Sequence, residues 1–244
     1  MSNVILVTSG KGGVGKSTVA SALGMTFASM RRKTVIVELD IGLRGLDLML
    51  GVEDRAIYDL GNILRGECLL SDGVIPVGFD GYLSLVVAPS GISSRIDYDD
   101  VAELCKALSG YFDTVIIDAP AGIGVSLLLA PKVADLVLMV ATPDMVSARD
   151  AGRLTGMLEQ HGVPKIRLII NKVYHKKIRL NEMEDLDAVI DLVGAQLIGV
   201  VPMSEELSSI EFGADSFQKS KLCSKVFENI ASRILGDYVE LLIQ

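Results

Sequence analysis

The sequence has few cysteines, and its three, Cys68, Cys105 and Cys223, are far apart and form neither a CxxC pair nor a Cys/His cluster. A disulfide framework and a metal-thiolate site are therefore not expected, and all three residues should be reduced thiols. The longest apolar stretches, such as VADLVLMVA, are well short of the roughly 20 residues that span a bilayer. The N-terminus lacks the pattern of a secretory leader, so we expect a cytoplasmic protein.

Basic charge is also scarce. The 23 lysines and arginines are outnumbered by 31 aspartates and glutamates, which gives a net charge of -8. This balance disfavours general nucleic-acid binding, because phosphate contacts need a basic surface, and no specific nucleic-acid partner is expected. The one local basic stretch, KVYHKKIR at 172–179, is interpreted as a solvated loop.

Short β-branched runs recur along the chain, and helix-like stretches separate most of them. Their apolar residues are nearly continuous, as expected for parallel strands covered by helices on both faces. The sequence therefore predicts one domain over 1–244, of the α/β class, with a doubly wound, mostly parallel sheet. The predicted strands are 3–8, 33–39, 83–89, 113–118, 135–141, 165–171 and 196–201.

The last segment, from Lys219 to Gln244, predicts a helix that packs on the sheet. Its apolar residues recur at helical spacing. The predicted stripe contains Leu222, Val226, Phe227, Ile230, Ala231, Ile234, Leu235 and Tyr238. The polar face mixes both signs of charge, unlike the strongly basic face of a membrane-surface helix.

The segment GKGGVGKS fits the phosphate-loop pattern G-x-x-x-x-G-K-[ST], directly after a predicted strand and before a predicted helix. Glycines let backbone N–H groups surround a polyphosphate, and the helix N-terminus adds a positive dipole end. Lys16 is expected on the β and γ phosphates, and the Ser17 hydroxyl on Mg²⁺. The predicted nucleotide-binding residues here are Gly10, Lys11, Gly12, Gly13, Val14, Gly15, Lys16, Ser17 and Thr18.

Lys11 is an extra cation, because the general pattern leaves its position free. It is unfavourable beside Lys16 unless anionic phosphate neutralises both charges. Lys11 could reach phosphates bound by a second subunit, as an arginine finger does, or it could stay on its own nucleotide or in solvent. The spacing alone leaves these alternatives open.

The segment KGGVGKST resembles the deviant Walker A motif of the MinD/ParA ATPases, and the resemblance covers residues 2 to about 236. It implies ATP and Mg²⁺ as cofactors, a slow, partner-stimulated ATPase, and an ATP-dependent homodimer in which Lys11 acts in trans. Lys11, Lys16 and Asp40 are then the catalytic residues.

Two acidic residues follow predicted strands. Asp40, in ELDIGLRGLD, is placed to orient a water or to cap a turn, and DIGLRGLD is similar to the switch I sequence of the MinD group, whose first Asp positions the hydrolytic water. Asp118 ends the strand DTVIID as a Walker B carboxylate does, and DAPAGI resembles switch II. The predicted metal-site residues are Ser17, Asp40 and Asp118.

Asn171 stands just beyond a predicted strand, where its amide could pair with the edge of adenine or simply form a turn. Related ATPases use an Asn or Arg in this region for the base, so the resemblance favours adenine recognition. Backbone at 201–207, including Pro202, would complete that pocket. Three residues depart from the pattern usual in the MinD group: Glu38, Gly45 and Gly124.

The resemblance implies an ATP-driven switch that protein partners read to place the division septum. A flagellar-placement regulator and a ParA-type partitioning ATPase are the alternatives, and the isolated cysteines argue against a metal-cluster carrier. The sequence ends at YVELLIQ without the basic amphipathic helix that attaches the MinD group to membranes. Direct membrane binding is therefore not carried over, and any peripheral membrane location is expected through partners.

Overall fold

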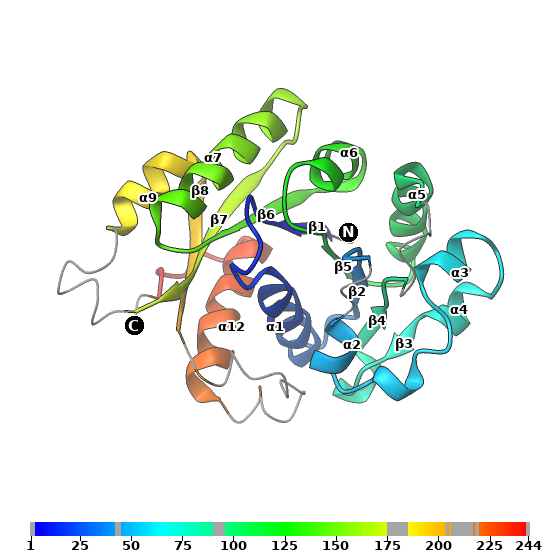
Figure 1. The fold of residues 1–244 in the computed structure, drawn as a ribbon. Helices are drawn as coiled ribbons and strands as arrows, with labels where there is room; N and C mark the ends of the chain where they lie inside the picture. The colour runs from blue at the N-terminus through cyan, green and yellow to red at the C-terminus, as the bar shows by residue number, and fades with distance from the viewer. Residues whose placement is uncertain are drawn as a thin grey trace.

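An eight-stranded sheet forms the centre of the molecule, with the strand order β3-β4-β2-β5-β1-β6-β7-β8 (Figure 1). The computed structural model describes residues 3–41, 45–89, 96–174, 185–203, 205, 217 and 220–242. All strand pairs are parallel except β3 with β4. The strands are β1 (Asn3–Thr8), β2 (Thr34–Glu38), β3 (Ile75–Pro76), β4 (Leu83–Val86), β5 (Thr114–Asp118), β6 (Leu136–Ala141), β7 (Ile166–Val173) and β8 (Gln196–Pro202).

Helices cover both faces of this sheet, so the predicted doubly wound α/β class is confirmed. The helices are α1 (Lys16–Ser29), α2 (Leu46–Met49), α3 (Leu60–Leu64), α4 (Leu70–Gly73), α5 (Tyr98–Leu108), α6 (Gly124–Val133), α7 (Met145–Gln160), α9 (Leu186–Val193) and α12 (Lys221–Leu235), with 3-10 turns η1 (Glu53–Arg55) and η2 (Phe79–Gly81). Helices α1 and α12 pack on one face, and α5, α6, α7 and α9 pack on the other.

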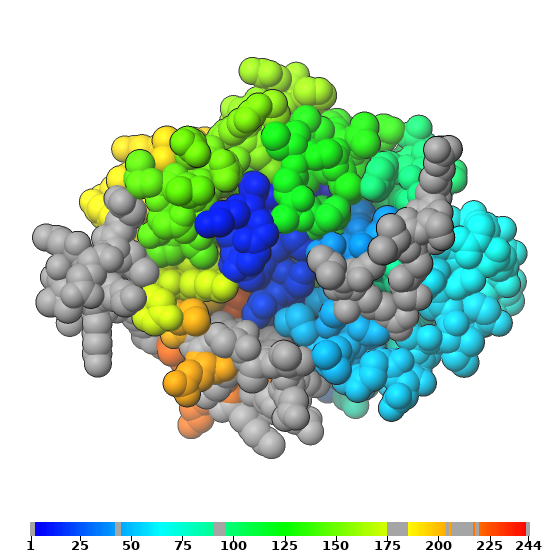
Figure 2. Space-filling view, viewed as in Figure 1, coloured from blue at the N-terminus to red at the C-terminus, as the bar shows by residue number. Residues whose placement is uncertain are grey.

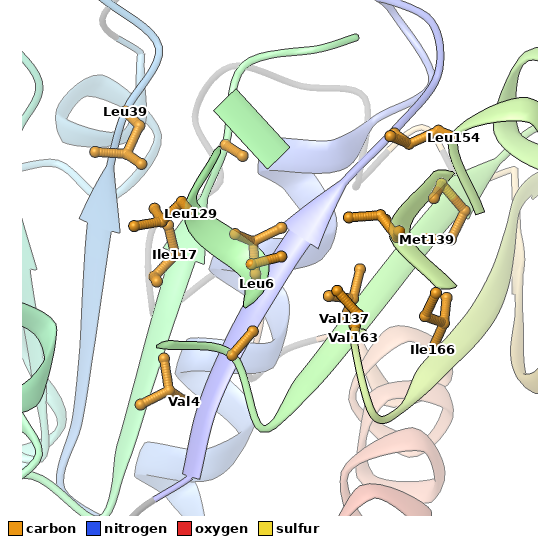
Figure 3. Close-up of a cluster of buried hydrophobic side chains, with 14 of the residues drawn as sticks. Val4, Leu6, Leu39, Ile117, Leu129, Val137, Met139, Leu154, Val163 and Ile166 are labelled. Atoms are coloured by element: carbon orange, nitrogen blue, oxygen red, sulfur yellow. The ribbon is translucent and has the colours of Figure 1, made fainter. Parts of the chain in front are cut away.

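Alternation along β1 shows how one strand serves both cores. Ile5 and Val7 are buried in the cluster under α1 and α12, whereas Val4 and Leu6 are buried in the opposite cluster. Figure 3 shows that second cluster, where Leu6 lies among side chains of neighbouring strands and helices. This two-sided burial explains why the strands read as continuous apolar runs instead of alternating ones.

All seven predicted strands are present, and the sequence missed only β3 among the described strands. That strand has two residues, pairs antiparallel with β4 and lies at the edge of the sheet. It contains Pro76, which is tolerated at an edge because it has no N–H to donate to a neighbour. A run this short carries no periodicity that a sequence pattern could detect.

The C-terminal helix is present, but the prediction was wrong about its end and about two members of its stripe. Helix α12 ends at Leu235, because Gly236 adopts a left-handed conformation with φ 97° and caps it. Tyr238 therefore lies beyond the helix and is fully exposed, and Leu222 in the first turn is 41% exposed. Val226, Phe227, Ile230, Ala231 and Ile234 are buried as predicted.

Several predicted features fall partly outside the described residues: positions 42–44 of DIGLRGLD, the basic stretch from residue 175 onward, positions 204, 206 and 207 of the proposed base pocket, and Lys219 of the C-terminal helix. Lys172 and Val173, at the start of the basic stretch, belong to β7 and not to a loop. No helix in the part of the chain that the structure describes is long and apolar enough to cross a membrane.

Candidate functional site

The loop between β1 and α1 lies at the carboxyl end of the central strand and opens into solvent. In Figure 2 the blue atoms of this N-terminal region are visible in the middle of the face. Gly13 and Gly15 adopt left-handed conformations, with φ 79° and 87°, which glycine reaches without strain. Gly15 is the N-cap of α1, whose first turn has neither a side-chain cap nor an acidic residue. The N–H groups and dipole of this helix end therefore favour an anion.

Gly10 is fixed by a close approach to helix α7. A Cβ atom built on Gly10 would lie 2.4 Å from the carbonyl carbon of Asp150, so no larger side chain fits there. The Ser9 hydroxyl donates to the Lys11 carbonyl at 2.9 Å, which orders the next peptide. Beyond it, Lys11 is exposed at the surface together with Gly12 and Gly13.

Lys16 and Asp118 form a buried ion pair beneath the loop. The Nζ atom of Lys16 lies 2.7 Å from Oδ1 of Asp118 and 3.2 Å from Oγ of Ser17. Side-chain exposure is 7% for Lys16 and zero for Asp118. Within the described residues, Oδ2 of Asp118 is buried without a hydrogen-bond partner. The structure thus brings together three of the residues that the sequence assigned to phosphate and Mg²⁺.

Burial raises the pKa of Asp118, the Lys16 ammonium opposes that shift, and the negative charge of Asp40 adds to it. Asp40 is half-buried and lies two residues beyond the end of β2. Strand β2 is the neighbour of β5, which ends at Asp118. The predicted acidic partners therefore belong to one electrostatic cluster at the carboxyl ends of adjacent strands. Hydrolytic and metal-binding roles for Asp40 remain predictions.

A divalent cation fits the donor set of this cluster. An unpartnered buried carboxylate oxygen and a neighbouring hydroxyl are hard oxygen ligands of the type that Mg²⁺ takes along with water and phosphate oxygens. Among the described residues, no group of three or more His, Cys, Asp and Glu side chains could hold a metal alone. That is consistent with a cation that arrives with a phosphate ligand.

Glu38 is the register partner of Asp118 and makes contacts that the sequence did not reveal. Its Oε1 accepts from the backbone N–H groups of Gly45 and Leu46, at 2.9 and 3.0 Å, and its Oε2 accepts from Ala88 N–H at 3.2 Å. Burial raises the pKa of Glu38, while these three donors partly counter the shift. Glu38 thus ties the segments after β2 and β4 together beside the site. An acid at the end of an otherwise apolar strand was the available signal.

The end of β7 holds the phosphate loop from the opposite side. Asn171 Nδ2 donates to the Val14 carbonyl at 2.8 Å, and its Oδ1 accepts from the Lys172 N–H at 2.9 Å. Lys172, at a left-handed φ of 60°, donates its Nζ to the Gly13 carbonyl at 2.7 Å. We call this pair the β7 clamp. The sequence pointed to Asn171 as a base-binding residue and missed the contact of Lys172.

Pro202 lies on the neighbouring strand at the same edge of the sheet. It is the register partner of Val173, and Met203 N–H donates to the Val173 carbonyl at 3.0 Å. Pro202 and Asn171 are therefore on adjacent strands, at the end of the sheet where the sequence predicts a shared base pocket. Adenine binding by these residues stays a prediction, because the Asn171 amide is already engaged on both sides by the clamp. Gly124 is exposed, with open space around it.

A glycine-rich loop at the central strand, a lysine at the helix start and an acid at the adjacent strand end define a P-loop nucleotide-binding protein. Known proteins agree with this class. The family description "CobQ/CobB/MinD/ParA nucleotide binding domain" matches residues 5–216. The septum site-determining protein MinD of Synechocystis is 35% identical over 99% of this chain and 92% of its own length. The corresponding Bacillus subtilis protein is 33% identical, with the same coverage of both chains.

A solved structure gives the same answer. The MinC:MinD cell division protein complex of Aquifex aeolicus contains a chain with a TM-score of 0.89, 29% identity and 99% coverage of both chains. The chain therefore belongs to the MinD group of the CobQ/CobB/MinD/ParA nucleotide-binding family. The family that the sequence resemblance indicated is confirmed.

Proposed function

We propose that this chain is a Mg²⁺-dependent ATPase switch for septum placement, dimeric with ATP and released by hydrolysis. The observation that carries the proposal is the junction of buried Lys16 and Asp118 with half-buried Ser17, under a glycine-rich loop at a helix N-terminus. Membership of a nucleotide-binding family supports the ligand class. The names of the relatives, septum site-determining proteins, favour division over flagellar placement or plasmid partition.

The residues of the junction have separable roles. Lys16 would exchange its contact with Asp118 for the β and γ phosphates, and Ser17 and Asp118 would hold Mg²⁺. The metal, when bound, neutralises charge on the phosphate oxygens. Asp40, half-buried beside Asp118, would accept a hydrogen bond from the attacking water and orient it. Asn171 and Pro202 would flank the adenine.

Lys11 is the residue proposed to act across the dimer. It is exposed, whereas Lys16 is buried, so the two lysines of one loop face different surroundings. An exposed cation on the face of the phosphate loop can reach the phosphates of a second copy. There it would balance charge that develops during transfer.

Partners and location follow from the same reading. The MinC:MinD complex shows that a solved relative of this fold associates with a second division protein. We propose a partner of that kind for the ATP-bound dimer, stimulation of a slow hydrolysis by such partners, and a cytoplasmic location with any membrane contact made through them.

Light scattering tests the switch directly. Asp40→Ala, which should bind ATP without turnover, is measured with Mg·ADP and then with Mg·ATP. The expected mass is 26.1 kDa with ADP and twice that with ATP. Adding Lys11→Ala should leave ATP bound to a monomer, Lys16→Ala should abolish binding, and Lys106→Ala is the control for loss of an exposed lysine. A monomer in ATP would overturn the switch, and a dimer formed by the Lys11 variant would overturn only the trans role.

A further inference from the structure

A second charged cavity lies at the other end of β7 from the phosphate loop. Its volume is about 310 Å³. Strand β7 runs from this cavity to the β7 clamp on the phosphate loop. The two sites therefore lie at opposite ends of the strands. The polar residues and the aromatic residue that line it are Lys165, Arg167, Gln196, Arg233, Asp237 and Tyr238.

Three cations converge here. Lys165 immediately precedes β7, and Arg167 is on the face of β7 where Ile169 packs under α1 and α12. Arg233 is in the last turn of α12, which runs back along that face. Asp237 supplies one carboxylate, which leaves a formal excess of two positive charges in a chain whose net charge is -8.

Much of the donor capacity of these cations is unused. Arg167 donates Nη1 to the Ile166 carbonyl at 2.9 Å, and Arg233 donates Nη1 to the Val239 carbonyl at 2.8 Å. The Nε of Arg233 is buried and has no hydrogen-bond partner among the described residues. None of the ion pairs in the described ranges includes any of the three cations. These contacts use one terminal nitrogen of each arginine, so the remaining donors of Lys165, Arg167 and Arg233 can serve an anionic acceptor in the cavity.

We propose that this cavity binds the phosphate group of a small phosphorylated anion. Guanidinium groups offer planar pairs of donors that match phosphate oxygens, and a third cation suits a group that carries two negative charges. A single carboxylate would neutralise only half of the excess charge. Arg167 and Arg233 are the main ligands in this proposal, Lys165 adds charge, and Asp237 limits the affinity.

Calorimetric titration of inorganic pyrophosphate tests the site. The protein is first saturated with Mg·ADP, which keeps the probe out of the phosphate loop. Saturable binding is expected, with affinity reduced about tenfold by Arg167→Gln or Arg233→Gln, the loss of one charge-assisted contact. Asp237→Asn should strengthen binding. Lys221→Gln, the same change of charge at the exposed start of α12, should have no effect.

The Arg233 variant also loses its bond to the Val239 carbonyl, so Lys165→Gln serves as a second variant. No side-chain hydrogen bond of Lys165 within the described residues is lost by that change. The Lys165→Gln variant should bind pyrophosphate more weakly than wild type, while its urea unfolding midpoint stays unchanged. Equal losses in the Lys165 and Lys221 variants would show general charge attraction and overturn the site.

Vesicles distinguish the source of the phosphate. Sedimentation with phosphatidate vesicles that depends on Arg167 would assign the cavity to a lipid phosphate, and pyrophosphate binding without sedimentation would assign it to a soluble one. If neither probe binds in an Arg167-dependent manner, the proposal is wrong.

Discussion

Replacing Glu38 by alanine should destabilise the protein strongly, although Glu38 is itself a costly residue to bury. The N–H groups of Leu46 and Ala88 donate to the Glu38 carboxylate, and both residues are fully buried. Gly45 is half-buried, so water can replace the carboxylate at its N–H group. Each orphaned buried donor costs about 1–3 kcal/mol. Removing the buried carboxylate also removes its desolvation cost, which offsets part of this loss. We therefore expect the free energy of unfolding to fall by about 2–4 kcal/mol.

Glu38→Gln separates geometry from charge. Its remaining carbonyl oxygen can still accept from Gly45 and Leu46, while its amide group faces the Ala88 N–H, so the expected loss is smaller, about 1–2 kcal/mol. Urea unfolding at constant m measures both values. Glu159→Ala, a truncation at an exposed position, is the control. An alanine variant within about 0.5 kcal/mol of wild type, or a glutamine variant that is less stable than alanine, would refute the reasoning.

The pH dependence of Glu38 has a definite sign. Because burial raises its pKa, the folded state binds this proton more tightly than the unfolded state does. The contribution of this proton to the free energy of unfolding is fully present below pH 4.5, the ordinary pKa of a glutamate. It is lost as the pH rises through the raised pKa of the folded state. The stability of wild type relative to Glu38→Gln should therefore fall over that interval. The opposite slope would contradict the assigned pKa direction.

Three further predictions concern other positions. Gly10→Ala should weaken ATP binding at least about tenfold, since its Cβ would collide with the backbone of α7; unchanged affinity in fluorescence titration would count against this contact. Lys172→Met should weaken ATP and GTP equally, whereas Asn171→Ala should weaken ATP more; identical patterns would exclude a separate base role for Asn171. Burial raises the pKa of Cys105 to about 12, so a disulfide reagent at pH 8 should modify partly exposed Cys68 first, and Cys68→Ser should remove the fast phase.

The fold was predictable because its strands are buried on both faces. Continuous apolar runs such as 136–141 mark parallel strands, and the intervening helical stretches fix the doubly wound class. The predictions failed at the end of α12 and at strand β3, where local backbone conformation determines the structure. Gly236 ends α12 before Tyr238, although the spacing of apolar residues continues through that position. The edge strand at Ile75 is too short for any periodicity.

The positions of the glycine-rich loop and of Asp118 in the fold were predictable, because each is part of a short motif beside a recognisable strand. Contacts between distant segments were not. The hydrogen bonds of Glu38 reach across 50 residues to Ala88, and those of Lys172 reach across 159 to Gly13. No pattern of spacing encodes such pairs, since the fold alone brings them together.

The ion pair between Lys16 and Asp118 means that the lysine of the phosphate loop is already held by an acid of its own chain. A polyphosphate that took Lys16 alone would leave a fully buried carboxylate without a counter-charge, which is strongly unfavourable. A polyphosphate that arrives with a divalent cation compensates both partners at once. We therefore expect the site to prefer the metal complex over the free polyphosphate, because of a contact that the chain makes with itself.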